Sequence, residues 1–138
     1  MKLAVSILAI AFSLSTLTAQ SDEVTITVTI DNVTSDEGKV LLGLHTAETF
    51  MRGPGIQNLE SEIKDGKVEF TFKNVPAGTY AIMALHDAND NKQMDFEANG
   101  MPKESYGMSG NDMSMGPPTF EAAKFDVDSE NLDFTIRF

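Results

Sequence analysis

The chain has 138 residues, of which 41% are hydrophobic, contains no cysteine and carries a formal net charge of −11 at pH 7. This length fits a single domain, and the lack of cysteine excludes disulfides, thiolate metal sites and a cysteine nucleophile. The acidic balance argues against nucleic acid and anionic membranes as partners, because both would repel the chain.

The N-terminus has the pattern of a secretory signal peptide. Lys2 precedes an apolar and small-residue run from Leu3 to Leu14, and a short polar segment then leads to Ala19. A membrane-spanning helix needs about 20 apolar residues, which this run does not reach. We expect residues 1–19 to be removed on export to the periplasm or the cell exterior. Residues 20–138 would then form one domain without membrane attachment.

Alternation of apolar and polar residues predicts β-strands over most of the remaining chain. Val24–Ile30 alternates valine and isoleucine with threonine, which is typical of a strand with one face in the core. Thr79–His86 is apolar at both odd and even positions, which predicts a central strand covered on both sides. The full set of expected strands is Val24–Ile30, Val40–His45, Lys67–Asn74, Thr79–His86, Ala122–Asp128 and Leu132–Phe138.

Turn signals separate these runs, as in "SDEG" before Val40 and "VPAG" before Thr79. The spacing predicts an all-β fold, a single antiparallel β-sandwich of about seven strands as in Ig-like domains. A helix is expected only as one short turn around Thr46–Gly53. One long loop follows the central strand, because Glu97–Pro118 is rich in Gly, Met, Pro and Ser. A loop of this length in a compact domain is usually functional or mobile.

The segment "NVPAGTYAIMALHDANDNKQMDFEANGMPKESYGMSG", followed by "GPPTFEAAKF", resembles an uncharacterised family of small exported bacterial proteins, a domain-of-unknown-function family. Its members carry the signature "F..L.PG.YA…HD.N.NG..D….G.PKE.YGFS", and the resemblance covers nearly the whole mature chain. A strand followed by "PAGTY" is also similar to transthyretin-like and surface-protein B-type sandwiches. The resemblance implies export and a β-sandwich, and it implies no established activity.

Two residues depart from the family signature. Lys92 stands where the family usually has Gly, and Met108 stands where it usually has Phe. A residue other than Gly in the left-handed conformation costs about 1 kcal/mol or more. Lys92 therefore argues against a left-handed turn at this point.

The stretch "DANDNKQMD" has the ligand spacing of a calcium loop. Oxygen-bearing side chains stand at positions one, three, five and nine of an EF-hand-like loop, where alternate residues converge on one ion: Asp87, Asn89, Asn91 and Asp95. Gln93 is at position seven, where the usual ligand is a backbone carbonyl. The sequence therefore predicts a calcium site between Asp87 and Asp95.

The spacing does not decide which residue supplies the last ligand of this loop. Position twelve, usually a bidentate Glu, is Ala98, while Glu97 stands one residue early and Asn99 one residue late. Glu97 is included among the candidate metal ligands. Repulsion among the carboxylates of this stretch raises the free energy of the empty loop until a cation offsets it. The alternative is a solvated acidic loop whose side chains bond to their own backbone.

These features favour an exported binding or interaction module that meets a protein or glycan partner at the cell envelope, with calcium shaping the loop. The chain has no nucleophile elbow, phosphate loop or zinc-protease helix, so we expect no enzyme. A hydrolase or a hydrolase accessory domain is one alternative.

A soft-metal carrier is the other alternative, with copper held by Met and His. His45 and His86 each end an apolar strand and could meet at one edge of the sandwich. Thioethers are soft ligands suited to Cu(I). The methionines that gather in and before the long loop are Met94, Met101, Met108, Met113 and Met115.

Overall fold

The structure, a computed structural model, describes residues 23–112 and 116–138, so the expected signal peptide at residues 1–19 lies outside the described residues. No helix in these two ranges is long and apolar enough to cross a membrane. Their elements are eight strands and one short helix: β1 (Val24–Ile30), β2 (Lys39–His45), β3 (Gln57–Glu62), β4 (Val68–Val75), β5 (Gly78–Asp87), β6 (Tyr106–Met108), α1 (Phe120–Ala123), β7 (Phe125–Val127) and β8 (Leu132–Thr135).

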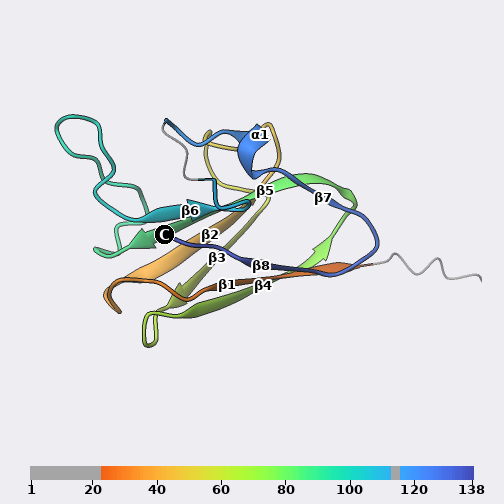
Figure 1. Cartoon of the computed structure of the whole chain (residues 1–138), viewed down its shortest axis with the longest axis horizontal. Coiled ribbons are helices and arrows are strands. Elements are labelled where there is room, and N and C mark those ends of the chain that lie inside the picture. Colours follow the sequence, from red (N-terminus) through yellow and green to blue (C-terminus); the bar gives the residue numbers. More distant parts are fainter. Residues whose placement is uncertain (1–22, 113–115) are drawn as a thin grey trace, which may run out of the picture.

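The strands form two sheets. One has the order β4-β1-β8, and the other has the order β3-β2-β5-β6, with β7 pairing the beginning of β5. Figure 1 shows β1, β4 and β8 below β5 and β6. Every pairing of named strands is antiparallel except that of β1 with β8. The predicted all-β sandwich is confirmed.

The main core lies between the two sheets. On β1 the four apolar residues Val24, Ile26, Val28 and Ile30 are 0% exposed, because period-two alternation turns all of them to one face. Phe72 on β4 joins them and is also 0% exposed. Burial of this apolar surface is the main source of stability for a domain without disulfides.

A second, smaller apolar cluster covers β5 on its other side. Ala81 on β5 and Met108 on β6 pack there with Phe50 and with Ala123 of α1. Ile82, the neighbour of Ala81, faces the main core and is 0% exposed. β5 is therefore an interior strand covered on both faces, as its apolar sequence predicts.

Several expected elements differ from the observed ones. The strand expected at 24–30 has the expected bounds, and those expected at 40–45, 67–74 and 79–86 are present with ends shifted by at most one residue. The C-terminal strand is shorter than expected and ends at Thr135. In the expected strand Ala122–Asp128, only Phe125–Val127 pairs as a strand, because the Thr119 hydroxyl accepts a hydrogen bond from the Ala122 N–H and caps a short helix that ends at Ala123.

The segment between residues 46 and 53 makes turns and no helix, with the Phe50 N–H donating to the Thr46 carbonyl at 3.0 Å. Glu97–Pro118 is not one loop, because β6 divides it. β6 pairs antiparallel with the end of β5, and the His86 N–H extends this ladder by donating to the Ser105 carbonyl at 2.9 Å.

The chain between these two strands, residues 88–105, therefore leaves the sheet and returns to it at the same place. We call this segment the excursion. It is the teal loop that projects at the upper left of Figure 1. Its two ends are fixed by the sheet, so side chains near its beginning and near its end can meet.

Candidate metal centre

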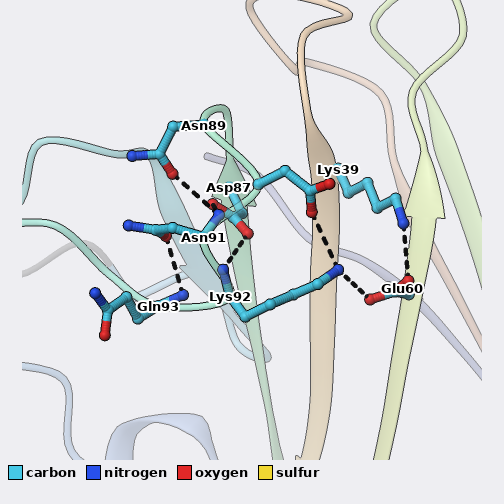
Figure 2. A network of polar contacts seen from close by, with 8 residues as sticks. Lys39, Glu60, Asp87, Asn89, Asn91, Lys92 and Gln93 are labelled. Carbon is cyan, nitrogen blue, oxygen red and sulfur yellow. Dashed lines mark hydrogen bonds and ion pairs between the residues drawn. The ribbon is translucent and has the colours of Figure 1, made fainter.

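Asp87, the last residue of β5, organises the start of the excursion. Its side chain is 0% exposed. One carboxylate oxygen, Oδ1, accepts a hydrogen bond from the Asn91 N–H at 3.1 Å, and Oδ2 accepts one from the Lys92 N–H at 2.8 Å. A buried carboxylate needs such donors, and bonds to a charged acceptor are the stronger ones. The backbone therefore wraps around Asp87, as Figure 2 shows.

Three further predicted ligands meet beside this turn. The Asn89 amide donates to Asp95 Oδ2 at 2.6 Å, and the Asn91 amide donates to Asp95 Oδ1 and Oδ2 at 3.0 and 2.9 Å. Asn91 is joined to Asp87 through its own N–H. We call Asp87, Asn89, Asn91 and Asp95 the loop cluster. The structure thus brings together four of the five residues that the sequence singles out.

The two amides of the loop cluster present their nitrogen atoms to Asp95. Their oxygens accept backbone bonds: Asn89 Oδ1 from the Asn91 N–H at 3.3 Å, and Asn91 Oδ1 from the Gln93 N–H at 3.1 Å. An amide offers a cation only its oxygen. Calcium in the loop cluster would replace the amide-to-carboxylate bonds with oxygen ligation to one ion.

Lys92 adopts the left-handed conformation, with φ of +65°, and Asp90 does so with φ of +53°. The expectation that Lys92 would not form a left-handed turn is therefore wrong. Its N–H is held by Asp87, and its ammonium lies 2.7 Å from Glu60 and 3.1 Å from Asp90. The hydrogen bond from its N–H to the buried Asp87 carboxylate offsets the backbone strain that Gly would avoid.

The Lys92 ammonium pairs with carboxylates that are not part of the loop cluster. Glu60 on β3 lies between Lys92 and Lys39, whose ammonium is 2.9 Å away. The hydrogen bond from Lys92, and then the one from Lys39, lower the pKa of Glu60 from 4.5 to about 2. Glu60, Lys92 and Asp90 are exposed and Lys39 is half-buried, so the network adds little stability. It does hold the Asp90 carboxylate at the Lys92 ammonium, 3.1 Å away.

Glu97, the fifth predicted ligand, lies in the tip of the excursion. It is exposed, and its N–H donates to the Met101 carbonyl at 2.7 Å in a small hairpin. Instead, a residue that sequence reasoning did not select lies beside the loop cluster: Glu104, whose Oε2 accepts a hydrogen bond from the Asp95 N–H at 3.3 Å. The sequence feature that could have identified Glu104 is the "PKE" motif of the family signature, in which it is the last residue.

Among residues 23–112 and 116–138, the side chains that ligate transition metals do not gather in a comparable way. His86 pairs with Val40 at one end of β2, whereas His45 is at the other end, so the two histidines lie about 17 Å apart along the strands at about 3.4 Å per residue. They form no shared site. Met108 is buried in the second apolar cluster, and Met101 is 61% exposed at the excursion tip. Met113 and Met115 lie outside the described residues.

Acidic and histidine side chains alone do not make a metal site here. In residues 23–112 and 116–138, no group of three or more His, Asp or Glu residues is placed to hold a metal ion. A site at the loop cluster therefore depends on the two asparagine oxygens. Such neutral oxygen ligands suit calcium and are poor ligands for zinc or copper.

Residues 28–135 match the model of a family described as "Uncharacterized protein conserved in bacteria (DUF2141)", and the chain belongs to this family. The resemblance to a domain-of-unknown-function family is thereby confirmed. No curated protein and no solved structure matches the chain.

Proposed function

We propose that this member of an uncharacterised bacterial family is an exported binding module whose excursion holds a calcium ion through the loop cluster. One observation carries the proposal: the Asn89 and Asn91 amides converge on the Asp95 carboxylate, beside a backbone that wraps the buried Asp87. EF-hand-like loops use the same positions one, three, five and nine, with a left-handed residue at position six. Lys92 has that conformation here.

The chemistry of the loop cluster favours a hard cation. Calcium takes six to eight oxygen ligands in flexible geometry, whereas magnesium requires a near-ideal octahedron and retains its waters. The loop cluster offers two carboxylates, two amides and the nearby backbone carbonyl at Gln93, position seven. With Lys92 in place of Gly, we expect weak binding, with a Kd between about 10⁻⁵ and 10⁻³ M as in extracellular modules.

The ion would act on the exposed tip of the excursion. Phe96 is 58% exposed and Met101 is 61% exposed there, close in sequence to the loop cluster. Exposed apolar side chains on a loop of defined shape are a common means of contacting a protein or glycan. Calcium would fix the loop that presents them, and the partner would lie at the cell envelope.

We also propose that the protein is exported and that its sandwich is related to transthyretin-like domains. The signal-peptide pattern of residues 1–19 supports export, and the "PAGTY" segment that leads into a strand supports the relationship. The intact mass of the secreted protein should correspond to a chain that begins at residue 20. Retention of Met1 in the secreted protein would contradict the assignment of residues 1–19 as a cleaved signal peptide.

Urea unfolding in calcium, in magnesium and in chelator tests the calcium site. A ligand that binds only the folded state stabilises it by RT ln(1 + [Ca]/Kd), about 2.7 kcal/mol at a hundredfold excess over Kd. Magnesium should stabilise much less. Asp95→Ala should lose the calcium increment, and the control Asp90→Ala should keep it, because Asp90 contacts Lys92 outside the loop cluster. Equal stability of the wild type in calcium and in chelator would overturn the proposal.

A further inference from the structure

Glu104 is brought to the loop cluster by the return of the excursion. The tip closes as a hairpin in which the Lys103 N–H donates to the Asp95 carbonyl at 2.8 Å and Phe96 forms a β-bridge with Pro102. The residue after Lys103 therefore lies beside Asp95, and Glu104 Oε2 accepts the Asp95 N–H. Seventeen positions separate Glu104 from Asp87 in the sequence, yet both are next to Asp95 or its partners.

The second carboxylate oxygen of Glu104 has no partner. Oε1 is buried and accepts no hydrogen bond, the one such buried side-chain atom in the described parts of the chain. No lysine or arginine within those parts forms an ion pair with Glu104 either. A buried carboxylate oxygen without a donor is unfavourable, and a bound ion or water is one partner that such an atom can take.

We propose that Glu104 supplies the closing ligand of the calcium site, in the role that position twelve has in an EF-hand-like loop. This inference rests on the proposed calcium site at the loop cluster. Ligation gives the orphaned Oε1 a cation as its partner, and a carboxylate can bind calcium through both oxygens. Glu97, exposed in the hairpin tip, stays free of the ion.

The position of Glu104 gives the ion a structural effect. Asp87 ends β5, and Glu104 stands two residues before β6. Asp87, Asp95 and Glu104 are not yet grouped to hold an ion, so an ion held by all three would draw them together and join the beginning of the excursion to its end. Binding would then order the whole hairpin tip, including Phe96 and Met101, and the tip would loosen when calcium is removed.

Calcium titration by isothermal calorimetry of the mature chain, residues 20–138, distinguishes the two glutamates. Glu104→Gln keeps the size of the side chain and an oxygen that can accept the Asp95 N–H, but removes the charge. It should weaken calcium binding by about tenfold or more, since even outer-shell partners of metal ligands account for about 10- to 100-fold. The matched variant Glu97→Gln should bind within about twofold of the wild type, because Glu97 makes no contact with the ion.

Terbium luminescence separates ligation from a merely structural role. Lifetimes in H₂O and D₂O count the water molecules on a bound Tb³⁺, an oxygen-seeking probe for calcium sites. Glu104→Gln should gain about one or two waters on the ion, since a carboxylate occupies one or two coordination positions. Glu97→Gln should gain none. In chelator, Glu104→Gln should melt no lower than the wild type, because it relieves repulsion near Asp95.

The outcomes are distinct. Weakened binding with added water in Glu104→Gln alone supports the inference. Wild-type affinity and water count in Glu104→Gln overturn it and leave the loop-cluster site standing, with water as the partner of Oε1. Loss of binding in Glu97→Gln alone assigns the closing role to Glu97 and also overturns it. Absence of calcium binding in the wild type removes the proposed site and this inference together.

Discussion

The main core and the excursion are stabilised in opposite ways. In the core, β1 contributes four apolar side chains that are 0% exposed, and their burial needs no ion and no specific partner. In the excursion, residues 88–93 are exposed, and the backbone is shaped by hydrogen bonds to Asp87 and between polar side chains. The comparison indicates that solution conditions should change the order of the excursion far more than the stability of the core.

The largest expected effect is in the core. Phe72→Ala on β4 removes a ring that is 0% exposed and should lower the free energy of unfolding by about 3–5 kcal/mol. The calcium-dependent increment in urea unfolding should be unchanged, because distant independent sites add. Thr71→Ala, an exposed neighbour on the same strand, serves as the control. A Phe72→Ala variant that folds but is no longer stabilised by calcium would show that the core and the excursion are not independent.

The next effect concerns the anchor of the excursion. Asp87→Ala removes the acceptor of the Asn91 and Lys92 N–H groups and should cost about 1–3 kcal/mol even in chelator. The variant should also show no further stabilisation by calcium. Both quantities come from urea unfolding with and without calcium. A loss smaller than about 0.5 kcal/mol in chelator would mean that the buried carboxylate does not organise the turn.

The third effect isolates the backbone strain at position 92. Lys92→Gly and Lys92→Ala both lose the ion pairs with Glu60 and Asp90, but only Gly adopts the left-handed conformation without a steric cost. Lys92→Gly should be more stable than Lys92→Ala by about 1 kcal/mol in denaturant unfolding. Equal stability of the two variants would show that the turn is not strained.

The smallest effect is a pH dependence in the core. Burial lowers the pKa of His45 from 6.5, although its hydrogen bond with Thr49 partly opposes this. Between pH 6.5 and the lower folded pKa, the unfolded chain binds a proton that folded His45 does not, so stability is present above pH 6.5 and falls as the pH is lowered. Urea unfolding at pH 7.5 and 5.5 should show this loss, and His45→Gln should reduce it. An unchanged pH dependence in His45→Gln would exclude His45 as its source.

Most of the fold could be predicted from the sequence, because the pattern of apolar residues in a strand shows which of its faces are buried. The alternation in β1 and β4 shows one buried face, and the continuous apolar run in β5 shows two. β3 does not, because the edge strand "QNLESE" is polar at nearly every position and pairs with β2 through its backbone. β6 has three residues in a Gly- and Ser-rich stretch, too few to show a period.

The candidate site could be predicted where it is local and not where it is closed by tertiary contacts. Spacing alone selected the loop cluster, whose members lie within nine residues. Glu104 was missed because its nearness to Asp95 depends on the hairpin of the excursion and on the pairing of β6 with β5. The left-handed Lys92 was missed because residue preference alone does not show the hydrogen bond from its N–H to the buried Asp87 carboxylate.

Native mass spectrometry of residues 20–138 in millimolar calcium and in chelator counts the calcium ions bound to each chain. We expect one calcium per chain in the wild type and in Asp90→Ala, and none in Asp95→Ala. Chains that retain no calcium at about 1 mM, or an Asp95→Ala variant that retains it as the wild type does, would contradict a calcium site at the loop cluster.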